Sequence, residues 1–168
     1  ELVLASTKTH KLADGTDYYA INPKGSVPLL ELDNGERLSE GPVIVQYLAD
    51  LAPASHLAPA NGTMARYRLQ EWLNFLTSEI HKGFSPLFNP ATPEDYKPLA
   101  KARLADRLRI VDAALEGKAY LMGDQFTVAD AYLFTLTNWA QPVGLDISNL
   151  AHLGAYRARV AARPAVQA

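Results

Sequence analysis

Apolar residues recur at helical spacing throughout the second half of the chain, from residue 63 onward. Residues 63–82 form the longest such segment, and we expect Gly83 to end this helix as its C′ residue. Its predicted core positions are Leu69, Trp72, Leu73, Leu76 and Ile80. Capping boxes that start at Thr92 and at Thr127 predict two further helices. Leu150, Leu153, Tyr156 and Val160 mark a last helix, which Pro164 is expected to break. This half is therefore predicted to be all-helical.

The first 51 residues show a different pattern. A short apolar run, residues 29–32, predicts a buried strand, and Asp33-Asn34-Gly35 is typical of a hairpin turn before a brief partner strand at 36–38. We expect Ser39 to be the N-cap of a helix over residues 42–51. Residues 1–5 indicate one more strand.

The hairpin and the helix after it could together bind an extended ligand. Pro28 has no N–H to donate, so Val27 beside it keeps a backbone edge with which a peptide could pair. The free amides of a helix start around Glu40 and Gly41 suit a carboxylate. The same pattern also fits an ordinary hairpin followed by a capped helix, and spacing alone does not separate the two interpretations.

Proline, asparagine and glycine, with no apolar period, mark residues 53–62 as a linker. The predicted organisation is thus an α/β domain over residues 1–52, the linker, and an all-helical domain over residues 63–168.

The helix predicted over residues 63–82 also carries a polar stripe. Its members are Arg66, Gln70, Asn74, Ser78 and His81, each three or four residues after the one before. Such a stripe is either a solvated helix face or a row of side chains that contact a ligand.

Composition narrows the possible functions. The chain has 168 residues, 48% of them hydrophobic, and a net charge of −2 with the two signs well mixed, so neither nucleic acid nor an anionic membrane is an expected partner. It has no cysteine, which excludes a disulfide, a thiolate metal site and a cysteine nucleophile within these residues. The four histidines, His10, His56, His81 and His152, are dispersed, and no metal site is predicted.

Several motifs together resemble the bacterial beta-class glutathione transferases. In the first half these are Asn22-Pro23-Lys24-Gly25-Ser26-Val27-Pro28, Leu38-Ser39-Glu40-Gly41 and Gln46-Tyr47-Leu48-Ala49-Asp50. In the second half they are Glu71-Trp72-Leu73-Asn74-Phe75, His81 to Phe88, and Phe126 to Phe134. The similarity covers essentially the whole chain in the family's order.

The resemblance implies a fold and a set of binding residues. The fold is a thioredoxin-like glutathione-binding domain followed by a helical-bundle domain. The implied contacts to glutathione are Val27, Pro28, Glu40 (for the γ-glutamyl amine), Gly41, Asn74, Ser78, Glu79, Ile80 and His81. Some of these contacts would cross the interface of a homodimer. The glycine carboxylate would meet a basic residue, either His10 or Lys11.

One departure concerns the cysteine that the family places near the glutathione sulfur, on a strand and helix that would precede Glu1. We therefore expect the 168 residues to be part of a longer polypeptide. Within the chain, His81 is the candidate catalytic residue, as a hydrogen-bond donor to the sulfur, with Lys82 as a weaker helper.

The predicted function is that of a cytoplasmic glutathione transferase that adds the glutathione thiolate to small electrophiles, with glutathione as co-substrate and a role in detoxification. The alternative is a binding module of the same fold that holds glutathione or apolar ligands without turnover. In such an enzyme the electrophile pocket would be built from side chains of the helical domain such as Phe84, Phe88 and Trp139.

Overall fold

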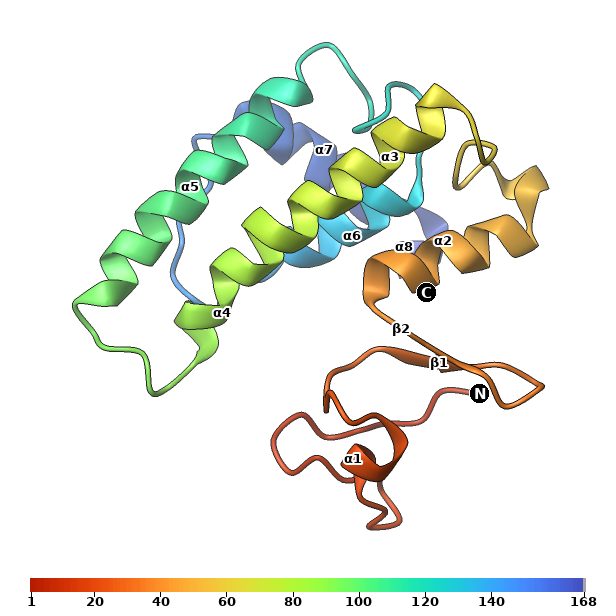
Figure 1. Ribbon diagram of the computed structural model, residues 1–168. Helices are drawn as coiled ribbons and strands as arrows, with labels where there is room; N and C mark the ends of the chain where they lie inside the picture. The colour runs from red at the N-terminus through yellow and green to blue at the C-terminus, as the bar shows by residue number, and fades with distance from the viewer. Residues whose placement is uncertain (168) are drawn as a thin grey trace. The chain divides into compact units, whose positions relative to one another are not determined.

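A computed structural model describes residues 1–167 of the chain (Figure 1). The chain forms two compact units, residues 1–48 and residues 49 onward. The domain limits predicted from the sequence stay a prediction.

The first unit is built around a small antiparallel hairpin. Strand β1 (Leu29–Glu31) pairs with β2 (Arg37–Ser39), which confirms the predicted hairpin. In the register of this pair, Leu30 lies opposite Leu38. Gly35, with a φ of 83°, closes the turn in a conformation that a residue with a Cβ rarely adopts. The short helix α1 (Tyr18–Ile21) precedes the hairpin, and α2 (Gly41–Leu51) follows it within two residues of β2.

Two local predictions in this unit are wrong. Residues 1–4 form no strand; Leu2 and Leu4 are exposed, and only Ala5 makes a single bridge, with Leu12. Ser39 is not the N-cap of α2 because it ends β2, paired with Leu29, and Glu40 takes the position before the helix instead.

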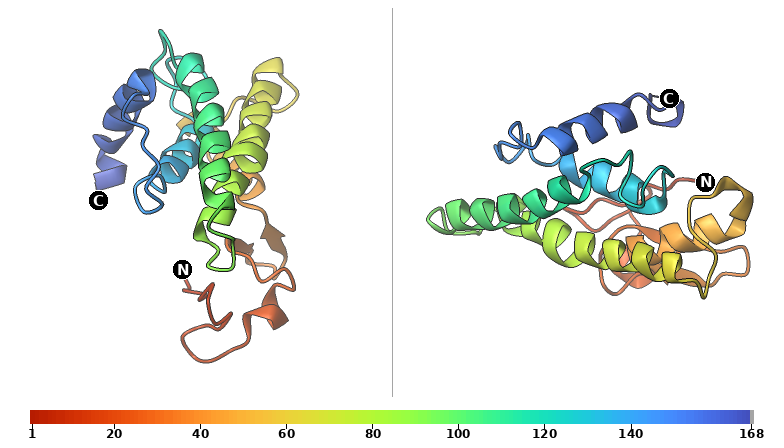
Figure 2. Two further views of the ribbon diagram at one scale, coloured as in Figure 1. Left: turned by 90° about the vertical axis from the view of Figure 1, so that its left-hand side faces the viewer. Right: turned by 90° about the horizontal axis from the view of Figure 1, so that it is seen from above.

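The second unit is an all-helical bundle. One long rod, made of α3, η2 and α4, packs against α5, while α6 packs against α3 and α7 against α5 (Figures 1 and 2). Its elements are the 3-10 turn η1 (Pro53–Ser55), α3 (Met64–Phe75), the π-helical segment η2 (Leu76–His81), α4 (Lys82–Phe88), α5 (Tyr96–Ala114), α6 (Val128–Thr137), α7 (Ala151–Ala161) and α8 (Pro164–Gln167).

The rod is longer than predicted, and its hydrogen-bond pattern changes in the middle. In η2 the Lys82 N–H bonds the carbonyl of Thr77, five residues back. The hydroxyls of Thr77 and Ser78 donate to carbonyls four residues earlier, at 2.8 and 3.0 Å, and so compete with the backbone for those acceptors. Segments of this kind are frequent at functional sites.

Gly83 does not end this helix, contrary to the prediction. It lies inside α4 where the rod meets α5, and a Cβ at this position would sit 3.0 Å from a Leu104 methyl carbon. The glycine therefore serves close helix packing. The capping box expected at Thr92 is also wrong, because α5 begins only at Tyr96, after an Asp95 whose side chain makes no cap bond.

The capping box at Thr127 is confirmed, and it starts α6. The helix ends at Thr137, and turns follow it. None of the helices within residues 1–167 has the length and apolar character needed to cross a bilayer.

Candidate active site

The first unit presents an exposed backbone rim at Val27. The Val27-Pro28 peptide bond is cis, and 46% of Val27 is exposed. Within residues 1–167, neither the N–H nor the carbonyl of Val27 makes a backbone hydrogen bond. Gly41, the first residue of α2, lies beside the Pro28 ring, so the rim and the helix start are neighbours.

Two buried polar side chains hold the residue before this rim. The Tyr18 hydroxyl and the Asn22 amide both donate to the Ser26 carbonyl, at 2.9 and 2.8 Å. Both side chains belong to the small core of the unit. The sequence analysis named Asn22 only within the motif from Asn22 to Pro28, and it did not predict a role for Tyr18, since neither residue belongs to a periodic apolar pattern.

Glu40 has an unusual backbone conformation at the start of α2. Its φ of 73° is in the left-handed region, which is costly for a residue other than glycine. Its carbonyl accepts hydrogen bonds from the N–H groups of Val43 and Ile44, so it opens the helix. Its carboxylate lies 2.7 Å from Nζ of Lys24, which also donates to the Ser39 hydroxyl at 3.1 Å.

Gly41 supplies the helix-start amide. Within residues 1–167 its N–H has no backbone or side-chain acceptor in the protein. The first unit thus places a backbone edge, a free amide at a helix start and an acidic side chain next to one another, which matches the chemistry of a short zwitterionic peptide.

The two basic candidates for the glycine carboxylate lie close to α1. The ring of His10 stacks on Tyr19 with 4.5 Å between ring centroids, and its Nδ1 is buried without a partner within residues 1–167. Lys11 is exposed. Which of the two meets a carboxylate stays a prediction.

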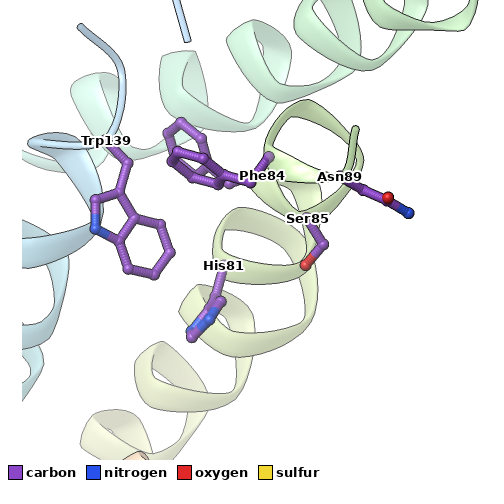
Figure 3. Close-up of a pocket in the computed structure, with 6 residues that line it drawn as sticks. His81, Phe84, Ser85, Asn89 and Trp139 are labelled. Atoms are coloured by element: carbon purple, nitrogen blue, oxygen red, sulfur yellow. The ribbon is translucent and has the colours of Figure 1, made fainter. Parts of the chain in front are cut away.

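The second unit contains a cavity of about 390 Å³ beside the π-helical segment (Figure 3). Three aromatic side chains, Phe84, Phe88 and Trp139, line it, and each ring of the two phenylalanines meets the indole nearly edge to face, with centroids 5.7 and 5.8 Å away. The polar lining consists of His81, Ser85 and Asn89. The three aromatic residues predicted for the electrophile pocket therefore lie together.

His81, the last residue of η2, faces this cavity (Figure 3). Its Nδ1 is 2.6 Å from the Tyr132 hydroxyl, and its ring meets Trp139 edge to face at 4.8 Å between centroids. Burial, with a smaller effect of the neighbouring Lys82 charge, lowers the pKa of His81 below its usual value of 6.5. The imidazole is therefore neutral at pH 7, with one nitrogen as donor and the other as acceptor.

The other predicted residues of the rod lie apart from this cavity lining. Asn74 and Ser78 are exposed, and the Ser78 hydroxyl is bonded to the Asn74 carbonyl. The Glu79 carboxylate accepts from Nε of Arg107 at 2.8 Å, on the side of α5. Ile80 is completely buried, which leaves no surface of its side chain for a ligand.

Tyr132 was not among the predicted site residues. It lies within the motif from Phe126 to Phe134, and no spacing within the sequence relates it to His81, 51 positions earlier. Within the described part of the chain, no three histidine, cysteine, aspartate or glutamate side chains are grouped so that they could hold a metal ion.

Comparison with known proteins shows the family of the chain. Residues 5–51 match the model of the glutathione S-transferase N-terminal domain, and residues 75–164 match that of the C-terminal domain. The glutathione S-transferase GstA of Escherichia coli O157:H7 is 47% identical over 99% of this chain and 83% of its own length.

Two solved structures share the fold over nearly the whole chain. The ternary complex of BphK, a bacterial GST, is 50% identical with a TM-score of 0.97, and covers 99% of this chain and 84% of that one. A sphingomonad glutathione S-transferase complexed with glutathione is 44% identical with a TM-score of 0.94, covering 98% and 82%. The chain therefore belongs to the glutathione S-transferase family, with the thioredoxin-like and helical domains of that architecture and a close similarity to the bacterial beta-class enzymes.

Proposed function

We propose that this glutathione transferase adds the thiolate of glutathione to small aromatic electrophiles. The observation that carries the proposal is the cavity in which His81 lies beside Phe84, Phe88 and Trp139. Aromatic rings prefer the edge-to-face and offset contacts that such a lining offers.

The first unit would hold the tripeptide. The Val27 backbone pairs with the extended peptide, and the Gly41 amide at the start of α2 receives the γ-glutamyl carboxylate. Glu40 receives the γ-glutamyl ammonium group in place of Lys24, its present partner at 2.7 Å. Because both members of that ion pair are 57% exposed, the exchange costs little.

The chemical step depends on the ionisation of the thiol. An unperturbed thiol has a pKa of about 8.5, so only a few per cent is thiolate at neutral pH. Each unit by which the pKa falls requires about 1.4 kcal/mol of preferential stabilisation of the anion. His81 as a hydrogen-bond donor to the sulfur would supply part of that stabilisation, in a site where burial strengthens the bond.

The relatives favour turnover over the alternative of a binding module, because they are named as transferases. The test is conjugation of glutathione to an aryl halide, compared with an alkyl halide of similar reactivity. A higher kcat/KM for the aryl halide is expected, and equal values would contradict the aromatic preference.

Replacing Glu40 with alanine is expected to raise the Kd for glutathione about tenfold, because the ammonium group of the tripeptide loses a charged hydrogen-bond partner. Calorimetric titration with glutathione measures the effect. Glu36→Ala is the matched control, since Glu36 is an exposed acid on the same hairpin whose carboxylate accepts from the Asn34 amide at the turn. An unchanged Kd for Glu40→Ala would count against the assigned peptide site.

Replacing His81 with alanine is expected to lower kcat about tenfold while the Kd for glutathione changes less than twofold, because the lost bond acts on the thiolate rather than on the rest of the peptide. Steady-state kinetics with the aryl halide and the titration above separate the two quantities. His152→Ala, at an exposed position of α7, is the control. Equal losses in kcat and in binding would argue for a simple binding role.

We also propose an oligomeric state and a cellular role for this enzyme. We expect a homodimer, with Asn74, Ser78, Glu79 and the main chain of Ile80 near glutathione, and a cytoplasmic role in detoxification. Sedimentation equilibrium tests the dimer, and a monomer at micromolar concentration would contradict it.

A further inference from the structure

The proposed function assigns a role to His81 of η2 but none to Tyr132 of α6, which contacts it. The two atoms, the Tyr132 hydroxyl oxygen and Nδ1 of His81, are 2.6 Å apart. Trp139, in the turn after α6, also meets the imidazole edge to face, so two aromatic side chains outside the rod contact the ring. Its orientation is therefore set by contacts outside its own helix.

The chemistry of the two groups indicates which one is the donor. A phenol O–H is a stronger acid than the N–H of a neutral imidazole, and the unprotonated imidazole nitrogen is a stronger acceptor than a phenol oxygen. The 2.6 Å contact is therefore best made with the Tyr132 hydroxyl as donor and Nδ1 of His81 as acceptor.

We propose that Tyr132 is a positioning residue that donates its hydroxyl proton to Nδ1 of His81 and thereby leaves Nε2–H as the donor of the ring. In a neutral imidazole one nitrogen carries the proton and the other accepts, so an occupied Nδ1 acceptor places the proton on Nε2. The inference rests on the proposed function in one respect only, namely that the donor of His81 is used on the glutathione sulfur.

The charged groups around His81 agree with a neutral ring. Lys82, the next residue, disfavours a second positive charge, and burial acts in the same direction. From α6 the titratable group that faces the ring is Tyr132. From α5 two arginines approach η2, and both pair with the Glu79 carboxylate. Nε of Arg107 lies 2.8 Å from a carboxylate oxygen, and a guanidinium nitrogen of Arg103 lies 3.7 Å from it.

The test is the Tyr132→Phe variant, which keeps the ring and removes the hydroxyl. NMR of the ligand-free protein with 15N-labelled histidine reads the tautomer directly, at a pH where the ring is neutral, with the His81 signals assigned by their absence in His81→Ala. In the wild type we expect the unprotonated 15N signal at Nδ1 and the protonated one at Nε2. In Tyr132→Phe the two tautomers should mix, because Nδ1 has lost its donor. A protonated signal at Nδ1 in the wild type would mean that the imidazole is the donor.

Kinetics provide the second measurement. Tyr132→Phe should lower kcat about threefold or more, leave the Kd for glutathione within about twofold, and have no further effect on kcat in the His81→Ala background. Tyr96→Phe, at an exposed tyrosine that starts α5, is the control and should leave both readings unchanged. A thermal melt of each variant verifies the fold.

Two results would overturn the proposal: a protonated Nδ1 in the neutral ring of the wild type, or a loss of kcat that is the same with and without His81. The expected Nε2–H tautomer together with a fully active His81→Ala would instead place the failure in the proposed role of His81 at the sulfur. The NMR measurement needs no glutathione, so the two failures are distinguishable.

Discussion

Replacing Asp130 with alanine is expected to lower the free energy of unfolding by about 3–5 kcal/mol, because it leaves buried donors without an acceptor. Asp130 has no exposed surface. One carboxylate oxygen accepts from the Leu121 N–H at 2.9 Å, and the other accepts from the Thr127 N–H at 2.8 Å and the Thr127 hydroxyl at 2.9 Å. Urea unfolding followed by far-UV circular dichroism measures the effect.

The loss should exceed that of an ordinary helix cap, which costs about 0.5–2 kcal/mol. The reason is that Asp130 also ties the loop at Leu121 to the start of α6. Asp124→Ala is the control, since Asp124 is exposed in the same loop, and its unfolding curve should match that of the wild type. A change below about 1 kcal/mol for Asp130→Ala would show that the two N–H groups find other partners.

The elements that the sequence predicted correctly are those whose determinants are local. The hairpin follows from an Asp33-Asn34-Gly35 turn between apolar residues, and Gly35 has the positive φ that such a turn requires. The capping box at Thr127 follows in the same way, because both of its members lie within one helical turn. In both cases a few neighbouring residues determine the conformation.

The wrong predictions concern residues whose state is decided by distant partners. Gly83 reads locally as a helix end, yet the approach of Leu104 from α5 is what requires a residue without a Cβ. Ser39 reads locally as an N-cap, yet its pairing with Leu29 keeps it in a strand. Neither partner is visible in a window of a few residues around the position.

The same rule holds for the candidate site. His81 was predicted at the sulfur, and the phenylalanines at positions 84 and 88 were predicted in the electrophile pocket. Because the helix was expected to end at Gly83, spacing did not predict that all three would lie on one rod and line one cavity. The contact of His81 with Tyr132 spans 51 positions and depends on how α6 packs, so the pattern could place Tyr132 only on a buried face. Spacing identifies the residues of one element, whereas packing decides which residue of another element they meet.

Glu40 shows where function and local preference conflict. Asparagine, aspartate or glycine would adopt its left-handed backbone at lower cost, yet a glutamate is present with its carboxylate directed at a cation. Strained residues of this kind persist when the surrounding structure over-determines them, and they gather at binding sites. This agrees with the proposed contact of Glu40 with the ammonium group of the tripeptide.

Replacing Asp50 with alanine is expected to lower the free energy of unfolding by about 2–3 kcal/mol at pH 7, because it leaves the guanidinium of Arg66 buried without its carboxylate. Only 4% of the Arg66 side chain is exposed, against 38% of Asp50, and two hydrogen bonds of 2.8 Å join the pair. The half-exposed carboxylate and a further bond from Arg66 to the Pro59 carbonyl, at 2.9 Å, limit the loss.

The stability lost in Asp50→Ala should depend on pH, because the ion pair with Arg66 changes the pKa of Asp50. The Arg66 hydrogen bonds lower the pKa of Asp50 from its usual value of 3.8. A carboxyl whose pKa is lower in the folded state stabilises the protein above its unfolded pKa, and that contribution is lost as the pH falls through the folded value. The difference between wild type and Asp50→Ala should therefore be constant from pH 7 to about pH 5 and shrink below pH 4.

The exposed pair between Arg68 and Glu71 on the same helix supplies the control. Both of its side chains are more than half exposed, so Glu71→Ala should leave the unfolding curve unchanged at either pH. Urea unfolding at pH 7 and at pH 3 makes the comparison for both variants. A loss in Asp50→Ala that persists undiminished at pH 3 would mean that Asp50 acts through packing rather than through its charge, since a protonated carboxyl no longer compensates the buried guanidinium.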